Sequence, residues 1–145
     1  MSESRRIVFI TLLVLGGLAT LAAAAAPVRA AAPAYQLLGK EAPDFALHAL
    51  KGNNVRLSEY LGEVVVLSFY GSRCAPCRTQ LEALDKSLKT YQSVGLRVFG
   101  INVDDDQARA LEFTKGQSVE FPLLFDPVKS VSRQYQVDNL PMTVL

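Results

Sequence analysis

Two cysteines separated by two residues are the part of this sequence best suited to chemistry. Cys74 and Cys77 are its only cysteines, and they enclose Ala75 and Pro76. On a helix whose first turn begins near Cys74, this spacing puts both sulfurs on one face, close enough to form a disulfide that opens easily. The pair therefore predicts a reversible thiol switch.

The expected position of Cys74 favours a nucleophilic role. At a helix N-terminus, unpaired backbone N–H groups and the positive end of the helix dipole favour thiolate over thiol. We predict that Cys74 is the nucleophile and that Cys77, one turn further in, is more buried and resolves the mixed disulfide. Pro76 lacks an N–H, which costs nothing in a first helical turn, so it can stiffen the loop between the sulfurs.

Alternating strands and helices are expected to position the cysteines. Val64–Tyr70 is a continuous β-branched and aromatic run, typical of a strand buried on both faces, and we place it at the centre of the sheet. Leucines at helical spacing predict an amphipathic helix from Cys77 to about Tyr91. The other expected elements are a hairpin with strands 45–47 and 55–57, strands 96–103, 121–125 and 141–145, a helix starting at 104–106 with Ala108, Leu111 and Phe113 buried, and a short helix around Val128, Val131 and Tyr135. This alternation predicts an α/β fold, with a central mixed but mostly parallel sheet and helices on both faces.

The first 30 residues have the pattern of a targeting segment. Arg5 and Arg6 precede an uncharged apolar run over residues 7–26, and the segment 28–30 has the small residues Val28 and Ala30 at the spacing that a signal peptidase reads. We expect a signal peptide over 1–30; the competing interpretation is an uncleaved membrane anchor, because the run approaches the ~20 residues that span a bilayer. Either way the chain is expected to be exported, to the periplasm or another extracytoplasmic space.

Composition and cysteine count narrow the function. The net charge is +1, with acids and bases interspersed, so no basic stripe indicates nucleic-acid binding. An exported protein with one CxxC pair and no other cysteine has a redox motif and no disulfide framework. Residues 31–40 are expected to form a linker, and residues 41–145 a single domain.

Segments along the predicted domain resemble the thioredoxin-like superfamily. They are Ala-Pro-Asp-Phe at 42–45, residues 57–62, residues 69–77 with the cysteines, residues 100–104, Phe-Pro at 121–122 and Leu-Pro-Met-Thr at 140–143. Their order and spacing are most similar to the extracytoplasmic TlpA/ResA-like and redoxin (AhpC/TSA-related) branches, which are thiol-disulfide oxidoreductases. A bare CxxC is weak evidence, whereas CxPC after a buried strand with a downstream Leu-Pro-Met-Thr is strong.

The resemblance implies further site residues and partners. Pro141 is expected to be the family's cis-proline facing the disulfide, and Leu140 to offer backbone groups to an extended substrate segment, with Arg73 and Pro76 beside them. The resemblance also implies a reductant of apocytochrome cysteines or other exported disulfides, fed by a membrane electron donor, with no cofactor and no metal.

Arg73 departs from the family pattern, which usually has tryptophan before the first cysteine. Two interpretations stay open. The guanidinium lowers the pKa of Cys74 further and favours acidic partners, or it is only a solvated side chain.

Two proton-accepting carboxylates of relatives are also missing. The family commonly has glutamate at the position of Gln80, and thioredoxin has a buried aspartate at the position of Ser68. The base for Cys77 is therefore unassigned. Glu82 and Asp104 are possible substitutes, although we interpret each as a surface charge.

The last departure is at residue 145. Relatives continue past the cis-proline strand into another antiparallel strand and a closing helix, so the fold is expected to lack its usual last strand and helix. We interpret the sequence as a piece of a longer protein.

A peroxiredoxin-like thiol peroxidase is the main alternative function. The run 122–127 resembles that family equally well. However, peroxiredoxins need threonine three residues before the peroxidatic cysteine, and aligning Cys77 with that cysteine puts Cys74 at the threonine position. They also need an arginine entering the late strand, where this chain has Pro141.

A thiol-based copper-binding module is a third interpretation. Two thiolates can hold a soft metal. The only histidine, His48, lies far upstream, whereas copper-delivering relatives use CxxxC with a downstream histidine. Covalent haem attachment requires CxxCH, and Arg78 follows Cys77 instead.

Overall fold

The structure is a computed structural model that describes residues 35–145. The predicted signal peptide or anchor over 1–30, and residues 31–34 of the predicted linker, lie outside the described residues.

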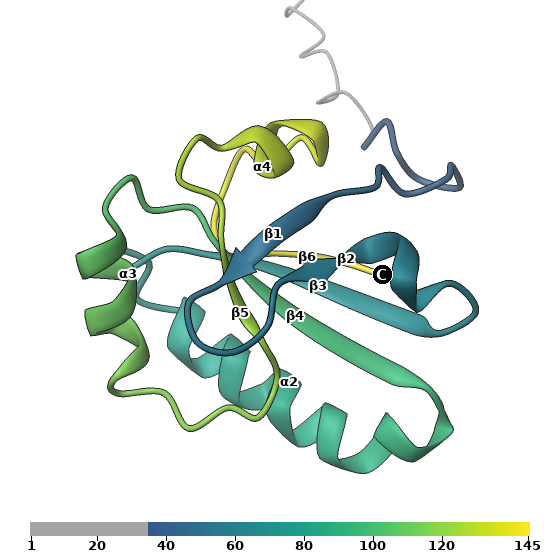
Figure 1. Cartoon of the computed structure of the whole chain (residues 1–145), viewed down its shortest axis with the longest axis horizontal. Coiled ribbons are helices and arrows are strands. Elements are labelled where there is room, and N and C mark those ends of the chain that lie inside the picture. Colours follow the sequence, from purple (N-terminus) through teal and green to yellow (C-terminus); the bar gives the residue numbers. More distant parts are fainter. Residues whose placement is uncertain (1–34) are drawn as a thin grey trace, which may run out of the picture. The chain divides into compact units, whose positions relative to one another are not determined.

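A six-stranded mixed sheet organises residues 35–145 (Figure 1). The strands are β1 (Ala46–Ala49), β2 (Val55–Arg56), β3 (Val64–Tyr70), β4 (Leu96–Asn102), β5 (Leu123–Phe125) and β6 (Met142–Val144). They lie in the order β2-β1-β5-β4-β3-β6. Strands β3, β4 and β5 are parallel, whereas β1 pairs antiparallel with β2 and β5, and β6 pairs antiparallel with β3. The expected central position of β3 is wrong: β6 adds only one strand beyond it, so β3 is second from the edge.

Helices cover both faces of the sheet, as predicted. They are α2 (Cys77–Tyr91), α3 (Gln107–Thr114) and α4 (Ser130–Gln134), with short 3₁₀ segments η1 (Leu57–Tyr60) and η2 (Gln92–Val94). Buried residues of α2 and α3 pack with alternate residues of β3 on one face, and α4 packs on the other.

Strand β3 separates two apolar clusters because its side chains alternate between the faces. Leu67 and Phe69 pack in the cluster that contains Val131 of α4. Val66 and Tyr70 pack in the cluster beneath α2. All four are buried, as expected for a strand covered on both sides.

The buried face of α3 differs from the predicted one. Ala110 and Phe113 are buried, whereas Ala108 is exposed and Leu111 is half-buried. The Asp106 side chain caps the helix by accepting from the Ala108 N–H at 2.9 Å. This cap fixes Ala108 in the exposed first turn and places residues 110 and 113 on the inner face.

Asp85 of α2 holds the segment that leads into β5. Its carboxylate accepts hydrogen bonds from the Glu120 N–H at 2.7 Å and the Lys89 Nζ at 2.7 Å, and its side chain is 7% exposed. Burial alone raises the pKa of a carboxyl, but the bonds from Lys89 and Glu120 outweigh it and hold the pKa of Asp85 below its ordinary value.

We expect Asp85→Ala to lower the free energy of unfolding by about 1–3 kcal/mol, because it leaves the Glu120 N–H without its acceptor. Asp85→Asn keeps an acceptor oxygen and should cost less. Because the pKa of Asp85 is lowered in the folded state, the carboxylate's contribution is present above about pH 4 and is lost as the pH falls through that lowered pKa. Urea unfolding of the wild type and of Asp85→Asn, from neutral pH down to below the lowered pKa of Asp85, measures this contribution to the free energy of unfolding. A stability difference that stayed constant into strong acid would contradict this account.

Candidate active site

The two cysteines lie in consecutive tight turns between β3 and α2. The Cys74 N–H donates to the Gly71 carbonyl at 3.1 Å, and the Cys77 N–H donates to the Cys74 carbonyl at 3.2 Å. Cys77, rather than Cys74, is the first residue of α2, and Pro76 is its N-cap. The helix starts at Cys77, as predicted. The Cys74 carbonyl accepts from an N–H three residues ahead, so the regular hydrogen bonds between residues four apart begin with the Gln80 N–H donating to the Pro76 carbonyl.

Cys74 and Cys77 are joined in a disulfide, with their Cα atoms 5.4 Å apart. Their surroundings differ. Cys77 is 0% exposed and packs with Tyr70 and Leu81 in the cluster under α2. Cys74 is half-buried and opens into a hollow of about 440 Å³. An external group can therefore approach one sulfur and not the other.

Leu140 lies beside the turn that carries Cys74. Both residues line the same hollow, and a Cβ on Gly71 would lie 3.2 Å from the Leu140 Cδ1. The absence of a side chain at Gly71 leaves room for this approach. The peptide bond between Leu140 and Pro141 is cis, and β6 begins at the next residue.

Asp104 connects the ends of β3 and β4 at the site. Its carboxylate accepts from the Ser72 N–H at 2.9 Å, the Ser72 hydroxyl at 3.0 Å and the Asn102 side-chain amide at 2.9 Å. The interpretation of Asp104 as a surface charge is therefore wrong: it is half-buried and holds the loop before Cys74. Glu82, by contrast, is exposed.

The positions where relatives have carboxylates are occupied by neutral groups. Gln80 donates its side-chain amide to the Thr143 hydroxyl and links α2 to β6. Ser68 is buried, and its hydroxyl has no hydrogen-bond partner within residues 35–145. Burial, and to a smaller extent the charge of Asp104, raises the pKa of nearby Tyr70 well above its ordinary value, so its phenol is neutral at physiological pH. None of the three is a carboxylate that could take a proton from Cys77.

Arginines surround the open side of the disulfide. Arg73 is exposed at the hollow that contains Cys74, and Arg109 of α3 lines the same hollow. Sequence reasoning did not identify Arg109 or assign a role in the site to Arg78. No local motif contains all three residues, since only the packing of α3 beside α2 brings them together. Lys129 lies here too, paired with Asp105 at 2.8 Å.

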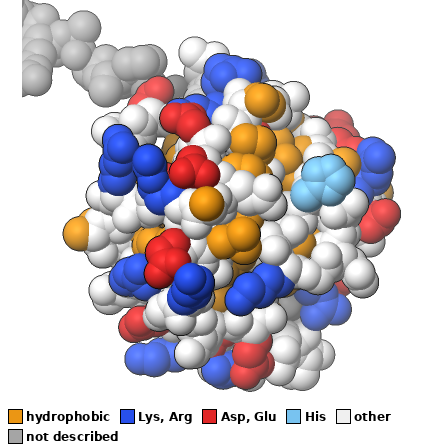
Figure 2. All heavy atoms as spheres, turned by 60° about the vertical axis from the view of Figure 1, so that its left-hand side comes forward, with side chains coloured by type: hydrophobic (Ala, Val, Ile, Leu, Met, Phe, Trp, Pro, Cys, Tyr) orange, Lys and Arg blue, Asp and Glu red, His pale blue; other side chains and the backbone are white. Residues whose placement is uncertain are grey.

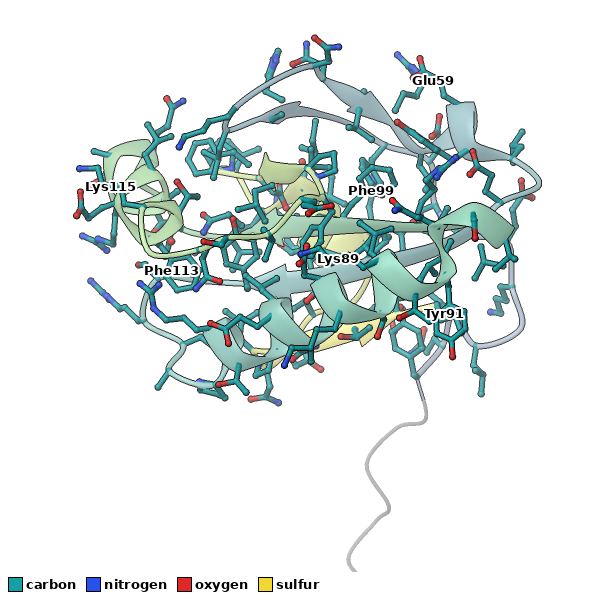
Figure 3. All side chains as sticks on the ribbon, turned by 90° about the horizontal axis from the view of Figure 1, so that it is seen from below. Glu59, Lys89, Tyr91, Phe99, Phe113 and Lys115 are labelled. Carbon is teal, nitrogen blue, oxygen red and sulfur yellow. A yellow bond between two sulfur atoms is a disulfide. The ribbon has the colours of Figure 1, made fainter. Side chains whose placement is uncertain are left out.

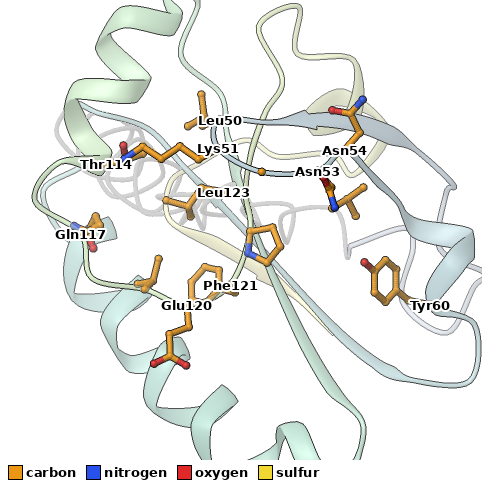
Figure 4. Close-up of a pocket in the computed structure, with 14 residues that line it drawn as sticks. Leu50, Lys51, Asn53, Asn54, Tyr60, Thr114, Gln117, Glu120, Phe121 and Leu123 are labelled. Atoms are coloured by element: carbon orange, nitrogen blue, oxygen red, sulfur yellow. The ribbon is translucent and has the colours of Figure 1, made fainter.

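A separate hollow of about 510 Å³ lies between the β1–β2 turn and the segment after α3 (Figure 4). Its lining includes Lys51, Asn53 and Gln117. The side-chain amide of Gln117 is buried without a partner among the described residues. The hollow contains neither cysteine, so it is not the site of the disulfide chemistry.

Within residues 35–145, no three His, Cys, Asp or Glu side chains are grouped so that they could hold a metal ion. His48 is exposed on β1 and contacts the Asn54 side chain at 2.9 Å. No helix in the same region has the length and hydrophobicity required to cross a bilayer.

Comparison with known proteins decides the family. Residues 38–145 match the sequence profile described as the AhpC/TSA family. The chain belongs to the AhpC/TSA family. This confirms the redoxin branch of the resemblance recognised in the sequence.

Relatives of this AhpC/TSA chain include two proteins named thiol-disulfide oxidoreductase ResA. That of Geobacillus kaustophilus (strain HTA426) is 33% identical over 108 residues, which cover 74% of this chain and 62% of the relative. That of Bacillus subtilis (strain 168) is 32% identical over 107 residues, which cover 74% and 60%. The chain thus spans less than two thirds of the length of these relatives.

A solved structure confirms the thioredoxin-like α/β fold of this AhpC/TSA member. The crystal structure of a Chlorobium tepidum protein, provisionally described as the thiol:disulfide interchange protein DsbE, superposes with a TM-score of 0.68. It is 35% identical, and the match covers 71% of this chain and 72% of that one.

Proposed function

We propose that the chain is a thiol-disulfide oxidoreductase that exchanges electrons between the Cys74/Cys77 pair and disulfides of other proteins. The observation that carries the proposal is the unequal burial of the two bonded sulfurs. Cys74 opens into a hollow at the surface, whereas Cys77 is enclosed by the core directly behind it. The ResA and DsbE names of its relatives support the same activity.

The exchange runs in two steps from the reduced state. The Cys74 thiolate attacks one sulfur of the substrate disulfide, which breaks, and the released substrate sulfur takes up a proton. The Cys77 thiolate then attacks the Cys74 Sγ, expels the second substrate sulfur and closes the Cys74–Cys77 disulfide. Two electrons and two protons pass to the substrate in total.

Four further residues are proposed to bind the substrate. Leu140 lines the hollow at Cys74 and is proposed to offer backbone groups to an extended segment, and the cis-proline Pro141 follows it directly. Arg73 and Pro76 are exposed on either side of Cys74 along the chain. Main-chain hydrogen bonds suit a substrate in extended conformation, because they hold it without regard to its side chains.

The physiological setting is proposed from the sequence. Residues 41–145 form the redox domain, carried outside the cytoplasm by the segment 1–30 and joined to it by the linker 31–40. There the chain acts as a reductant of exported proteins, including apocytochromes, and a membrane dithiol donor restores its two electrons. A reduction potential near the reducing end of the range of about −270 to −120 mV supports this direction, and one near the oxidising end overturns it.

We expect the reduced chain to react faster with a disulfide-linked peptide than with hydrogen peroxide. The sulfur that aligns with a peroxidatic cysteine is Cys77, and it is 0% exposed, so peroxide has no direct access to it. Stopped-flow measurements give the rates of the wild type and of Cys74→Ser with the disulfide-linked peptide and with hydrogen peroxide. Rapid peroxide consumption that persists in Cys74→Ser would contradict the proposal and favour the peroxidase alternative.

A further inference from the structure

Three arginines from separate elements converge next to Cys74. A hollow of about 530 Å³ is lined by Ser72, Arg73, Arg78, Arg109, Glu112 and Phe113. Arg73 and Arg109 also line the hollow that contains Cys74, so these two side chains lie between the reactive sulfur and the second hollow. A segment bound over Cys74 can therefore extend directly into the arginine-lined hollow.

Three positive side chains and one negative side chain line this hollow. Arg73, Arg78 and Arg109 take part in none of the ion pairs that residues 35–145 form. Glu112 is the one carboxylate in the lining, and Lys115 already pairs with it at 2.5 Å.

Two of the three carboxylates that line the neighbouring hollow are engaged, and the third, Asp138, forms no ion pair among the described residues. Lys129 pairs with Asp105, and Arg109 and Arg73 add to the effect that holds the pKa of Asp105 below its ordinary value. Asp104 accepts hydrogen bonds from Ser72. Figure 2 brings the α3 side of the molecule forward, where basic and acidic side chains alternate and apolar ones are exposed between them.

Arg78 is held in place before any ligand arrives. Its guanidinium carbon lies 4.2 Å from the centre of the Phe113 ring, and its Nη1 lies 3.4 Å from the Phe113 carbonyl. Figure 3 shows Phe113 between α3 and the start of α2. Stacking fixes the plane of the guanidinium and leaves N–H donors at its edge for an anion. Gly116 makes room for this arrangement, because a Cβ there would lie 2.8 Å from the Arg78 Nη1.

We propose that this hollow binds carboxylate side chains of the protein substrate, so that the chain prefers disulfides in acidic segments. The inference rests on the proposed thiol-disulfide exchange and adds a substrate class to it. A planar guanidinium matches a carboxylate with two parallel hydrogen bonds. Three of them within reach of Cys74 suit a segment with one or two acidic residues near its cysteine.

The test compares disulfide-closed peptides that differ only in the residues flanking one cysteine, which are Glu, Gln or Lys. The reduced full chain passes two electrons to each peptide, and the second-order rate is measured by acid quenching and chromatography. We expect the Glu peptide to react about tenfold faster than the Gln peptide at about 20 mM salt, with the advantage shrinking as salt increases. The Lys peptide should be slowest.

Variants identify the arginines responsible. Arg78→Gln/Arg109→Gln should reduce the Glu-to-Gln rate ratio about fivefold. Gly116→Ala should also reduce this rate ratio, because the added Cβ displaces the Arg78 side chain without changing the charge of the protein. Arg133→Gln is the control for net charge, compared with Arg109→Gln alone: each removes one positive charge, but Arg133 belongs to α4 and does not line the hollow, so its loss should leave the ratio unchanged.

Each outcome decides the proposal. Equal rates for the three peptides, or a ratio unaffected by the double variant, would overturn the acidic preference while leaving the exchange activity intact. A ratio reduced equally by Arg133→Gln would mean that net charge, and not this hollow, is responsible. If a small anionic disulfide reacted as much faster than the Gln peptide as the Glu peptide does, the ligand of the hollow would be a small molecule and not a protein segment. If no peptide is reduced, the proposed function itself fails.

Discussion

Cys77→Ser is expected to trap the chain in a covalent complex with its substrate. Cys74 can still attack a disulfide, but no second sulfur is available to release the bound partner. Multiple-turnover reduction should fall roughly a thousandfold, to the background rate of the assay. Non-reducing electrophoresis of the variant incubated with a disulfide protein measures the complex, which a dithiol reagent should dissolve.

Cys74→Ser is the matched control for this experiment. It leaves the single thiol enclosed at the start of α2, where Cys77 is 0% exposed, so neither turnover nor a trapped complex is expected. If Cys74→Ser formed the complex and Cys77→Ser did not, the roles of nucleophile and resolving residue would have to be exchanged.

Leu81→Ala should be the most destabilising simple truncation behind the site. Leu81 is 0% exposed and packs with Cys77 and Phe113 between α2 and the sheet. Removing its side chain creates a cavity in a region where helix and sheet constrain relaxation, at a cost of about 3 kcal/mol in the free energy of unfolding. With a slope of about 1.5 kcal/mol per molar urea, the midpoint should fall by about 2 M.

Leu38→Ala makes the same chemical change on the surface, because Leu38 is 83% exposed. Its effect should stay within about 0.5 kcal/mol. The comparison is made with the disulfide closed in both variants. Similar losses for the two variants would mean that the cluster under α2 does not support the fold as described.

Much of the fold follows from local sequence patterns. The bounds of β3 and α2 agree with the prediction, because a continuous run such as Val64–Tyr70 and leucines at helical spacing are each sufficient to identify an element. The hairpin is present as well, with Gly52 at a positive φ of 93° in its turn. The CxPC motif likewise leads directly to the disulfide.

Features that depend on packing between distant segments were not predictable. Strand β3 is second from the edge because only β6 lies beyond it, whereas β4, β5, β1 and β2 all lie on its other side, and no residue within Val64–Tyr70 encodes that order. The role of Asp104 depends on the Ser72 N–H, 32 residues earlier. Arg78 and Arg109 meet only because α3 packs against the start of α2. Sequence reasoning thus located the cysteine pair, with Arg73 and Leu140 beside it, and missed the hydrogen bonds of Asp104 and the presence of Arg109.

The enclosure of Cys77 has a consequence for kinetics under the proposed mechanism. The second sulfur reaches Cys74 from within the core, so the release of the partner is a unimolecular step. Its rate depends on an effective concentration fixed by the fold, and neither the concentration of the chain nor thiols in the medium alter it. Release by this route therefore proceeds at the same rate however much chain or partner is present.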